Sequence, residues 1–240
     1  ASYIGTKFCV SFNSGTSAGH AALLALGIKK NDEVIVPSFS FIATANWPLM
    51  VNAKPKFVDI EEQTLGLDPK KIESSITKKT KAIIPIHYAG LPCQIDKIKK
   101  ISNDYKIPLI EDAAESVGAS IRNRKVGTFG LLSIFSLAGN KVITAGEGGV
   151  IVTNSKNIFE KLKLIRSHGR QSKNYFSSTK PANYVSMGYN WRMSSITAAL
   201  STSQLNKISK LIQMRRNNSI YMIVQLSKFD EIQPPTEPKY

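Results

Sequence analysis

Histidine and cysteine are scarce in this chain, and their scarcity limits the kinds of site that it can hold. The three histidines are His20, His87 and His168, and no two of them have a spacing typical of metal ligands. The two cysteines, Cys9 and Cys93, lie far apart with no pairing or ligand spacing, so we interpret them as reduced structural thiols. We therefore predict no metal site.

Long apolar runs and acidic residues are also lacking. No run reaches the roughly 18 apolar residues of a membrane-spanning helix, and no leader-like segment is present, so we expect a cytoplasmic protein without membrane contact. Against 32 Lys and Arg there are only 17 Asp and Glu, which gives a net charge of +15. Without zinc-finger spacing or an aromatic-basic RNA motif, nucleic acid is an unlikely partner, whereas a phosphate-bearing substrate suits the charge.

Apolar clusters of strand length alternate with segments of helical period along most of the 240 residues, of which 42% are apolar. The predicted strands are 8–12, 34–36, 81–86, 107–110 and 150–153. The predicted helices are 18–26, which Gly27 ends, 95–105, and a long amphipathic helix capped by Ser194 or Ser195. This alternation predicts an α/β fold with a parallel sheet and crossover helices.

Ligands of parallel sheets bind at the loops that follow the strands, and the first such loop is rich in small hydroxyl residues. Residues 13–18 place Gly15, Thr16 and Ser17 between a strand and a helix. Free backbone N–H groups at a helix N-terminus favour a phosphate. The same residue types also cap helices for purely structural reasons, so both interpretations stay open.

Two later loops carry an acid and a lysine. Asp112 lies just past a buried strand, where a carboxylate either caps the next turn or meets a cationic ligand group. Lys141 stands between a strand and the glycine-rich turn 145–149. A lysine amine attacks a carbonyl only where its surroundings favour the neutral form, and most lysines of so basic a chain lie at the surface. Neither residue alone decides the function.

Together, these segments resemble a known enzyme family. Residues 13–18, Asp59, 111–115, 136–149 and 188–193 occur in the order and spacing of the DegT/DnrJ/EryC1/StrS sugar aminotransferases, which are fold-type-I pyridoxal-phosphate enzymes. The resemblance covers nearly the whole chain and implies a three-layer α/β sandwich with a mostly parallel central sheet. Segments 111–115 and 139–141 look most like the perosamine synthase branch, which aminates a GDP-linked 4-keto-6-deoxy sugar.

The resemblance also implies residue roles. Lys141 would hold pyridoxal 5′-phosphate covalently and shuttle a proton, and Asp112 would pair with the ring nitrogen of the cofactor. The other implied cofactor contacts are Gly15, Thr16, Ser17, Phe41, Glu115, Ser136 and Asn190. Asn190 would reach the cofactor of the other subunit in a homodimer with shared sites, and Glu115 stands where Gln or His is frequent in the family. His87 and Arg192 are candidate substrate contacts, each with a structural role as the alternative.

The family pattern further implies a large domain over 1–230, lacking an N-terminal segment, and a linker over 231–240 that leads to a small C-terminal domain. The implied reaction moves an amino group from L-glutamate to a nucleotide-linked 4-keto-6-deoxy sugar. Two rivals are a dehydratase or deoxygenase of the same fold, in which a histidine replaces the lysine, and a non-catalytic basic binding protein. The presence of Lys141 together with Asp112, Ser136 and Asn190 favours the aminotransferase.

Overall fold

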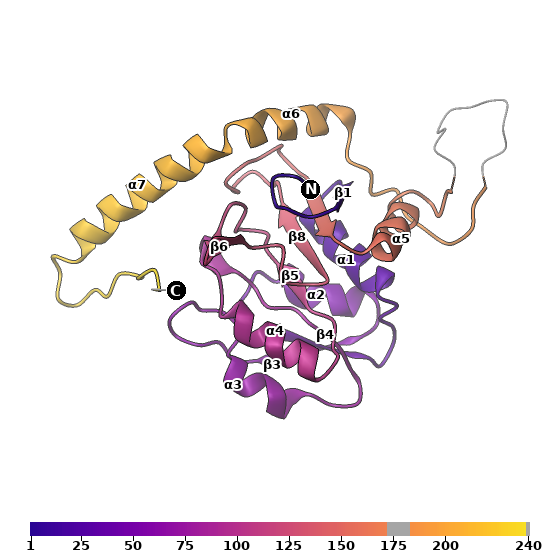
Figure 1. The fold of residues 1–240 in the computed structure, drawn as a ribbon, viewed down its shortest axis with the longest axis horizontal. Coiled ribbons are helices and arrows are strands. Elements are labelled where there is room, and N and C mark those ends of the chain that lie inside the picture. Colours follow the sequence, from indigo (N-terminus) through magenta and orange to yellow (C-terminus); the bar gives the residue numbers. More distant parts are fainter. Residues whose placement is uncertain (172–182, 239–240) are drawn as a thin grey trace.

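A computed structural model describes residues 1–171 and 183–238, and its centre is a mixed seven-stranded sheet (Figure 1). The strands are β1 (Phe8–Phe12), β2 (Glu33–Pro37), β3 (Lys54–Val58), β4 (Thr80–Ile83), β5 (Ile110–Asp112), β8 (Leu132–Ser136) and β9 (Gly149–Thr153). Parallel bridges from Ile83 to Leu109 and from Ile86 to Asp112 join β4 to β5, so the order is β3-β2-β4-β5-β8-β9-β1. Only β9 runs antiparallel to its neighbours in this sheet.

Helices cover both faces of this sheet. Core residues of α1 (Gly15–Ala25), α2 (Ala43–Met50) and α5 (Lys156–Arg166) pack with Val34 and Val36, whereas those of α3 (Pro69–Ile72) and α4 (Ile95–Asp104) pack with Ile35. Because successive strand residues point to opposite faces, the sheet is buried on both sides. The predicted three-layer α/β sandwich with a mostly parallel sheet is confirmed.

Local signals set the element ends. Ser14, Ser155 and Ser194 cap α1, α5 and α6 (Ser195–Asn206) by accepting backbone N–H groups. Gly27 follows α1 with a φ of 74°, where glycine relieves the steric cost of the left-handed conformation. The predicted strand 107–110 was placed too early, because β5 begins only after Pro108, which has no N–H for the ladder.

The predicted long helix is divided in two. After a break at Lys207, α7 (Ile208–Leu226) begins, and Figure 1 shows it extending away from the sheet. Ile208 is buried against Leu137 and Ile143. Other apolar residues of the two helices are exposed, including Ile196 at 84% and Tyr221 at 67%. No helix of the described residues is long and apolar enough to cross a membrane.

The remaining described elements are short. A hairpin of β6 (Ser120–Ile121) and β7 (Arg124–Lys125) follows β5, and the 3-10 turns η1 (Glu73–Ser75) and η2 (Tyr88–Gly90) follow α3 and β4. The turn η2 leads from the end of the β4 segment toward α4, so it lies at the sheet edge where the parallel strands end.

Candidate active site

The predicted site residues come from loops at one edge of the sheet. Residues 13–17 follow β1, Phe41 and Thr44 follow β2, Asp112 to Glu115 end β5, and Ser136 ends β8. The antiparallel strand β9 begins at this same edge with Gly149, which pairs with Ser136. Parallel topology therefore gathers residues that are up to about 130 positions apart in sequence.

The turn before α1 is tightly braced. Ser14 Oγ accepts the Ser17 N–H at 3.0 Å, and Ser17 Oγ donates to Asn13 Oδ1 at 2.5 Å. A Cβ added to Gly149 would lie 2.1 Å from the Ser14 carbonyl oxygen, so only glycine at position 149 lets β9 pack this close to the turn. A Cβ added to Gly15 would lie 3.2 Å from the Cβ of Ser136, a closer approach than most side chains make. Thr16 is half-buried in the first turn of the helix.

Asp112 is a buried carboxylate at the end of β5. Its side chain accepts the Thr44 hydroxyl at 2.6 Å and the Ala114 N–H at 3.2 Å. Burial raises the pKa of Asp112 above its ordinary value, although the bonds from Thr44 and Ala114 act in the opposite direction. Ser40 in turn contacts the Thr44 hydroxyl at 2.6 Å. The sequence reasoning missed Thr44 and Ser40, whose only sequence signal is their position just after β2.

Lys141 forms an ion pair with Glu115, and the Glu115 charge is close enough to Asp112 to help raise its pKa. The Lys141 Nζ lies 3.0 Å from Glu115 Oε1, with the two side chains 14% and 27% exposed. Glu115 Oε2 accepts the Ala89 N–H at 2.9 Å. Lys141 is thus held in a partly enclosed position instead of extending into solvent, and Glu115, the residue that departs from the common family pattern, is what holds it.

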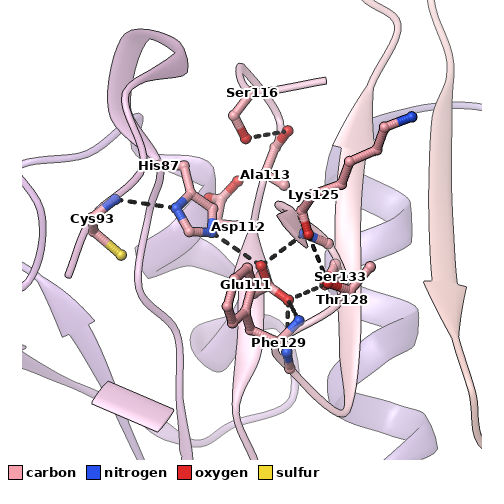
Figure 2. Close-up of polar contacts among 12 residues, drawn as sticks. His87, Cys93, Glu111, Asp112, Ala113, Ser116, Lys125, Thr128, Phe129 and Ser133 are labelled. Carbon is pink, nitrogen blue, oxygen red and sulfur yellow. Dashed lines mark hydrogen bonds and ion pairs between the residues drawn. The ribbon is translucent and has the colours of Figure 1, made fainter. Parts of the chain in front are cut away.

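Glu111 lies beside Asp112 on β5 but serves a different cluster (Figure 2). Its carboxylate is fully buried and accepts five hydrogen bonds, from the N–H groups of Gly127, Phe129 and Gly130, from Ser133 Oγ and from His87 Nε2. Burial raises the Glu111 pKa, but the bonds from His87 and the backbone outweigh it and hold the pKa below its ordinary value. Glu111 is therefore a structural carboxylate.

His87 is fully buried, and both ring nitrogens contact protein atoms: Nδ1 accepts the Cys93 N–H at 3.2 Å and Nε2 faces Glu111 at 3.2 Å (Figure 2). With no exposed surface and no free ring nitrogen, this side chain is not placed to contact a substrate. The prediction of a substrate contact at His87 therefore gives way to the structural alternative.

The segment with Asn190 and Arg192 contacts the turn before α1. The Trp191 carbonyl accepts the Asn13 N–H at 2.9 Å, and the Trp191 and Tyr189 rings stack with centroids 3.9 Å apart. Asn190 is exposed, and Arg192 is half-buried with Nη1 3.3 Å from Ser167 Oγ. The structure thus brings this segment next to residues 13–17, while the Asn190 side chain remains open to a partner.

Two further features delimit the site. Phe41, the predicted ring contact, is 68% exposed on the loop after β2, next to Phe39, whose ring lies 4.7 Å from that of Tyr88. A cavity of about 690 Å³ lies at the opposite edge of the sheet, lined by residues that precede β2 and β5 and by residues before and at the start of β4. That cavity contains none of the predicted site residues.

Comparison with known proteins agrees with this geometry. The model of the DegT/DnrJ/EryC1/StrS aminotransferase family matches residues 1–240. The chain belongs to this family.

Individual proteins also resemble this chain. A GDP-perosamine synthase of Caulobacter vibrioides is 41% identical over 216 residues, which cover 90% of this chain and 56% of the relative. The crystal structure of an aminotransferase from Psychrobacter cryohalolentis superimposes with a TM-score of 0.93 at 30% identity, covering 98% of this chain and 62% of that one. An E. coli GDP-4-keto-6-deoxy-D-mannose-3-dehydratase with bound hydrated PLP gives 0.85 at 33% identity, covering 95% and 63%.

The coverages show how much of each relative this chain spans. The chain spans about half to two thirds of the length of the relatives that it matches. The family model matches residues 1–240, which include the whole sheet and every predicted site residue. The similarity therefore extends over the region in which the candidate active site is built.

Proposed function

We propose that the protein is a pyridoxal-phosphate-dependent aminotransferase that moves an amino group from L-glutamate to a nucleotide-linked 4-keto-6-deoxy sugar. The observation that carries the proposal is the placement of Lys141. Its Nζ is held by Glu115 at 3.0 Å in a partly enclosed position. The Glu115 charge acts on the buried Asp112, and these residues lie at the same sheet edge as the Ser- and Gly-rich turn.

The residues of this edge fit the cofactor. Gly15 and Gly149 keep side chains away from the turn before α1, and Ser17 and Ser136 bring hydroxyl groups to it. The N-terminus of the eleven-residue helix α1 favours an anion there. A phosphate group at this turn would thus meet small residues, hydroxyl donors and backbone N–H groups. Phe41 and Glu115 would contact the ring and its hydroxyl.

Two side chains would carry the chemistry. The bound cofactor supplies an electron sink for the carbanion formed at the reacting carbon. Lys141 Nζ would take the proton from the substrate carbon that bears the amino group and deliver it to the cofactor carbon. The Asp112 carboxylate would accept a hydrogen bond from the ring N–H of the cofactor and so favour the charged form of the ring, which would stabilise the developing negative charge.

The substrate class rests on similarity to particular family members. A GDP-perosamine synthase is 41% identical to this chain, and segments 111–115 and 139–141 look like that branch, so a GDP-linked keto sugar is our first candidate. Because an E. coli dehydratase is 33% identical to this chain, dehydration is the second candidate reaction. Lys141 favours amino transfer over dehydration, because in the dehydratases of this fold a histidine replaces the lysine.

We further propose a homodimer in which Asn190 of each chain reaches the cofactor phosphate of the other. Asn190 is exposed, its segment contacts the turn before α1, and α6 and α7 expose several apolar side chains of the kind a subunit interface covers. Arg192 remains a candidate contact for an anionic substrate group. The cytoplasmic location expected from the sequence stays a prediction.

The test is an assay of the full-length protein with L-glutamate and GDP-4-keto-6-deoxymannose. Amino transfer gives 2-oxoglutarate and an amino sugar nucleotide in equal amounts and releases no ammonia. Deoxygenation with L-glutamate as the reductant gives a keto-deoxysugar nucleotide, 2-oxoglutarate and free ammonia, so the mass of the sugar nucleotide and the release of ammonia separate the two reactions. Lys141→Ala serves as the control that should give neither product. Absence of cofactor absorbance in the purified protein, combined with salt-dependent retention on DNA, would support the binding-protein rival instead.

A further inference from the structure

His87 closes the loop between the β4 segment and α4 at both of its ends. The His87 N–H donates to the Asp112 carbonyl at 3.0 Å, which fixes the start of the loop to β5. At the other end of the loop, the Cys93 N–H donates to His87 Nδ1 at 3.2 Å. One residue therefore sets the span of residues 88–93, because its backbone holds one end and its ring holds the other.

This loop carries a donor that reaches the candidate active site. Ala89 has a φ of 51°, a left-handed conformation that costs an alanine free energy and persists only where neighbouring contacts enforce it. In this conformation its N–H donates to Glu115 Oε2 at 2.9 Å, and Glu115 Oε1 holds Lys141 Nζ at 3.0 Å. The position of Lys141 thus depends on the shape of the loop.

The ring of His87 is itself held from the far side. Because Nδ1 accepts the Cys93 N–H, the ring proton lies on Nε2, which donates to Glu111. Glu111 accepts four further hydrogen bonds and is fully buried, so its carboxylate is fixed in place and in turn fixes the His87 ring. Figure 2 shows this chain of contacts from the Glu111 cluster through His87 to Cys93.

We propose that His87 is a positioning residue, which acts through the loop 88–93 and Glu115 to hold Lys141 at the reacting centre. The importance of Lys141 rests on the proposed function, but the mechanical link from His87 to the loop does not. The link predicts that the Nδ1 half of the ring, which holds Cys93, matters more to the site than the Nε2 half, which holds Glu111.

Two substitutions separate the halves. His87→Asn places an amide oxygen near the position of Nδ1, so it keeps an acceptor for the Cys93 N–H and loses the donor to Glu111. His87→Gln places an amide nitrogen near the position of Nε2, so it keeps that donor and leaves the Cys93 N–H without its acceptor. Asn is the smaller of the two, so a role in packing alone predicts that Asn is the more damaging change.

The first readout needs no cofactor and no substrate. Cys93 is buried, and the half-buried Cys9 on β1 provides an internal reference in the same molecule. In the cofactor-free full-length protein, we expect alkylation of Cys93 by iodoacetamide, relative to Cys9, to rise about tenfold in His87→Gln and to change little in His87→Asn. Ser133→Ala, which removes another donor to Glu111 without touching the loop, should leave the ratio unchanged.

The second readout is catalysis by the full-length holoenzyme. His87→Gln should lower kcat about tenfold with the KM for the sugar nucleotide unchanged, and His87→Asn should retain most of the turnover. If Asn is as damaging as Gln in either readout, the positioning role is wrong and His87 is a packing residue. If the wild type transfers no amino group while the Cys93 ratios follow the expected order, the proposed function fails and the link to the loop stands.

Discussion

Substitution of Asp112 tests whether this residue is needed for catalysis or for stability, because we expect turnover and melting temperature to respond differently. Asp112→Asn keeps the size of the side chain and removes its charge. The amide oxygen can still accept the Ala114 N–H, and the amide nitrogen can donate to the Thr44 hydroxyl oxygen. The Thr44 hydroxyl can then donate its hydrogen bond to Ser40 Oγ. The substitution therefore leaves the local hydrogen bonds satisfied while it removes the carboxylate.

The expected loss of turnover follows from the strength of a carboxylate beside a cationic ring nitrogen. An opposite charge at about 4–6 Å shifts a pKa by about 1–3 units. Each unit corresponds to about 1.36 kcal/mol. Without Asp112 the charged ring nitrogen loses that stabilisation, so we expect kcat to fall by roughly ten- to a thousandfold, measured at saturating L-glutamate and sugar nucleotide.

In contrast to turnover, the stability of the cofactor-free protein should not fall in Asp112→Asn. Burial raises the pKa of Asp112, so the folded state binds its proton more tightly than the unfolded state does. The stability that this carboxyl contributes is then present below its ordinary pKa of 3.8 and is lost as the pH rises through the raised value. At pH 7 the wild type bears this cost and Asp112→Asn does not, so the melting temperature of the variant should be equal or higher.

The matched control is Asp104→Asn, which removes one exposed carboxylate that pairs with Lys100 on α4. It should change neither turnover nor, beyond about 1 kcal/mol, stability. Near-normal turnover in Asp112→Asn would refute the assigned role. A melting temperature several degrees below that of the wild type would show instead that Asp112 is needed for the fold.

Three further predictions concern neighbouring residues. Lys141→Ala should abolish transamination and the absorbance of the bound cofactor, while changing the free energy of unfolding by only about 1 kcal/mol in urea titrations, because its one ion pair is partly exposed. Glu111→Gln should destabilise the protein by about 3–5 kcal/mol, because an amide nitrogen would face buried donors, and urea denaturation measures this. Mixing inactive Lys141→Ala and Asn190→Ala chains should restore about one quarter of wild-type activity if each site combines the two residues from different chains; no recovery would argue against shared sites.

The sequence was sufficient for the fold class and for most members of the candidate site. Alternating strand and helix periods predicted the layered sheet, and serine caps and Gly27 set helix ends, because these signals depend on near neighbours in the chain. Asp112, Lys141 and the turn 13–17 were recognisable because they occur together with other segments in the order and spacing of the family, whereas each alone also had a structural interpretation. The residue roles came from the family resemblance and not from local pattern.

Tertiary structure decided the contacts between distant segments. Nothing in the residues around His87 distinguishes a substrate contact from a buried residue, because the distinction depends on Glu111 and Cys93 meeting its two ring nitrogens. Thr44 was not predicted, because only the pairing of strands brings it within 2.6 Å of Asp112, 68 positions away. The break at Lys207 and the exposure of apolar residues on α6 and α7 were also not predictable, because helical period indicates an apolar face and does not say what covers it.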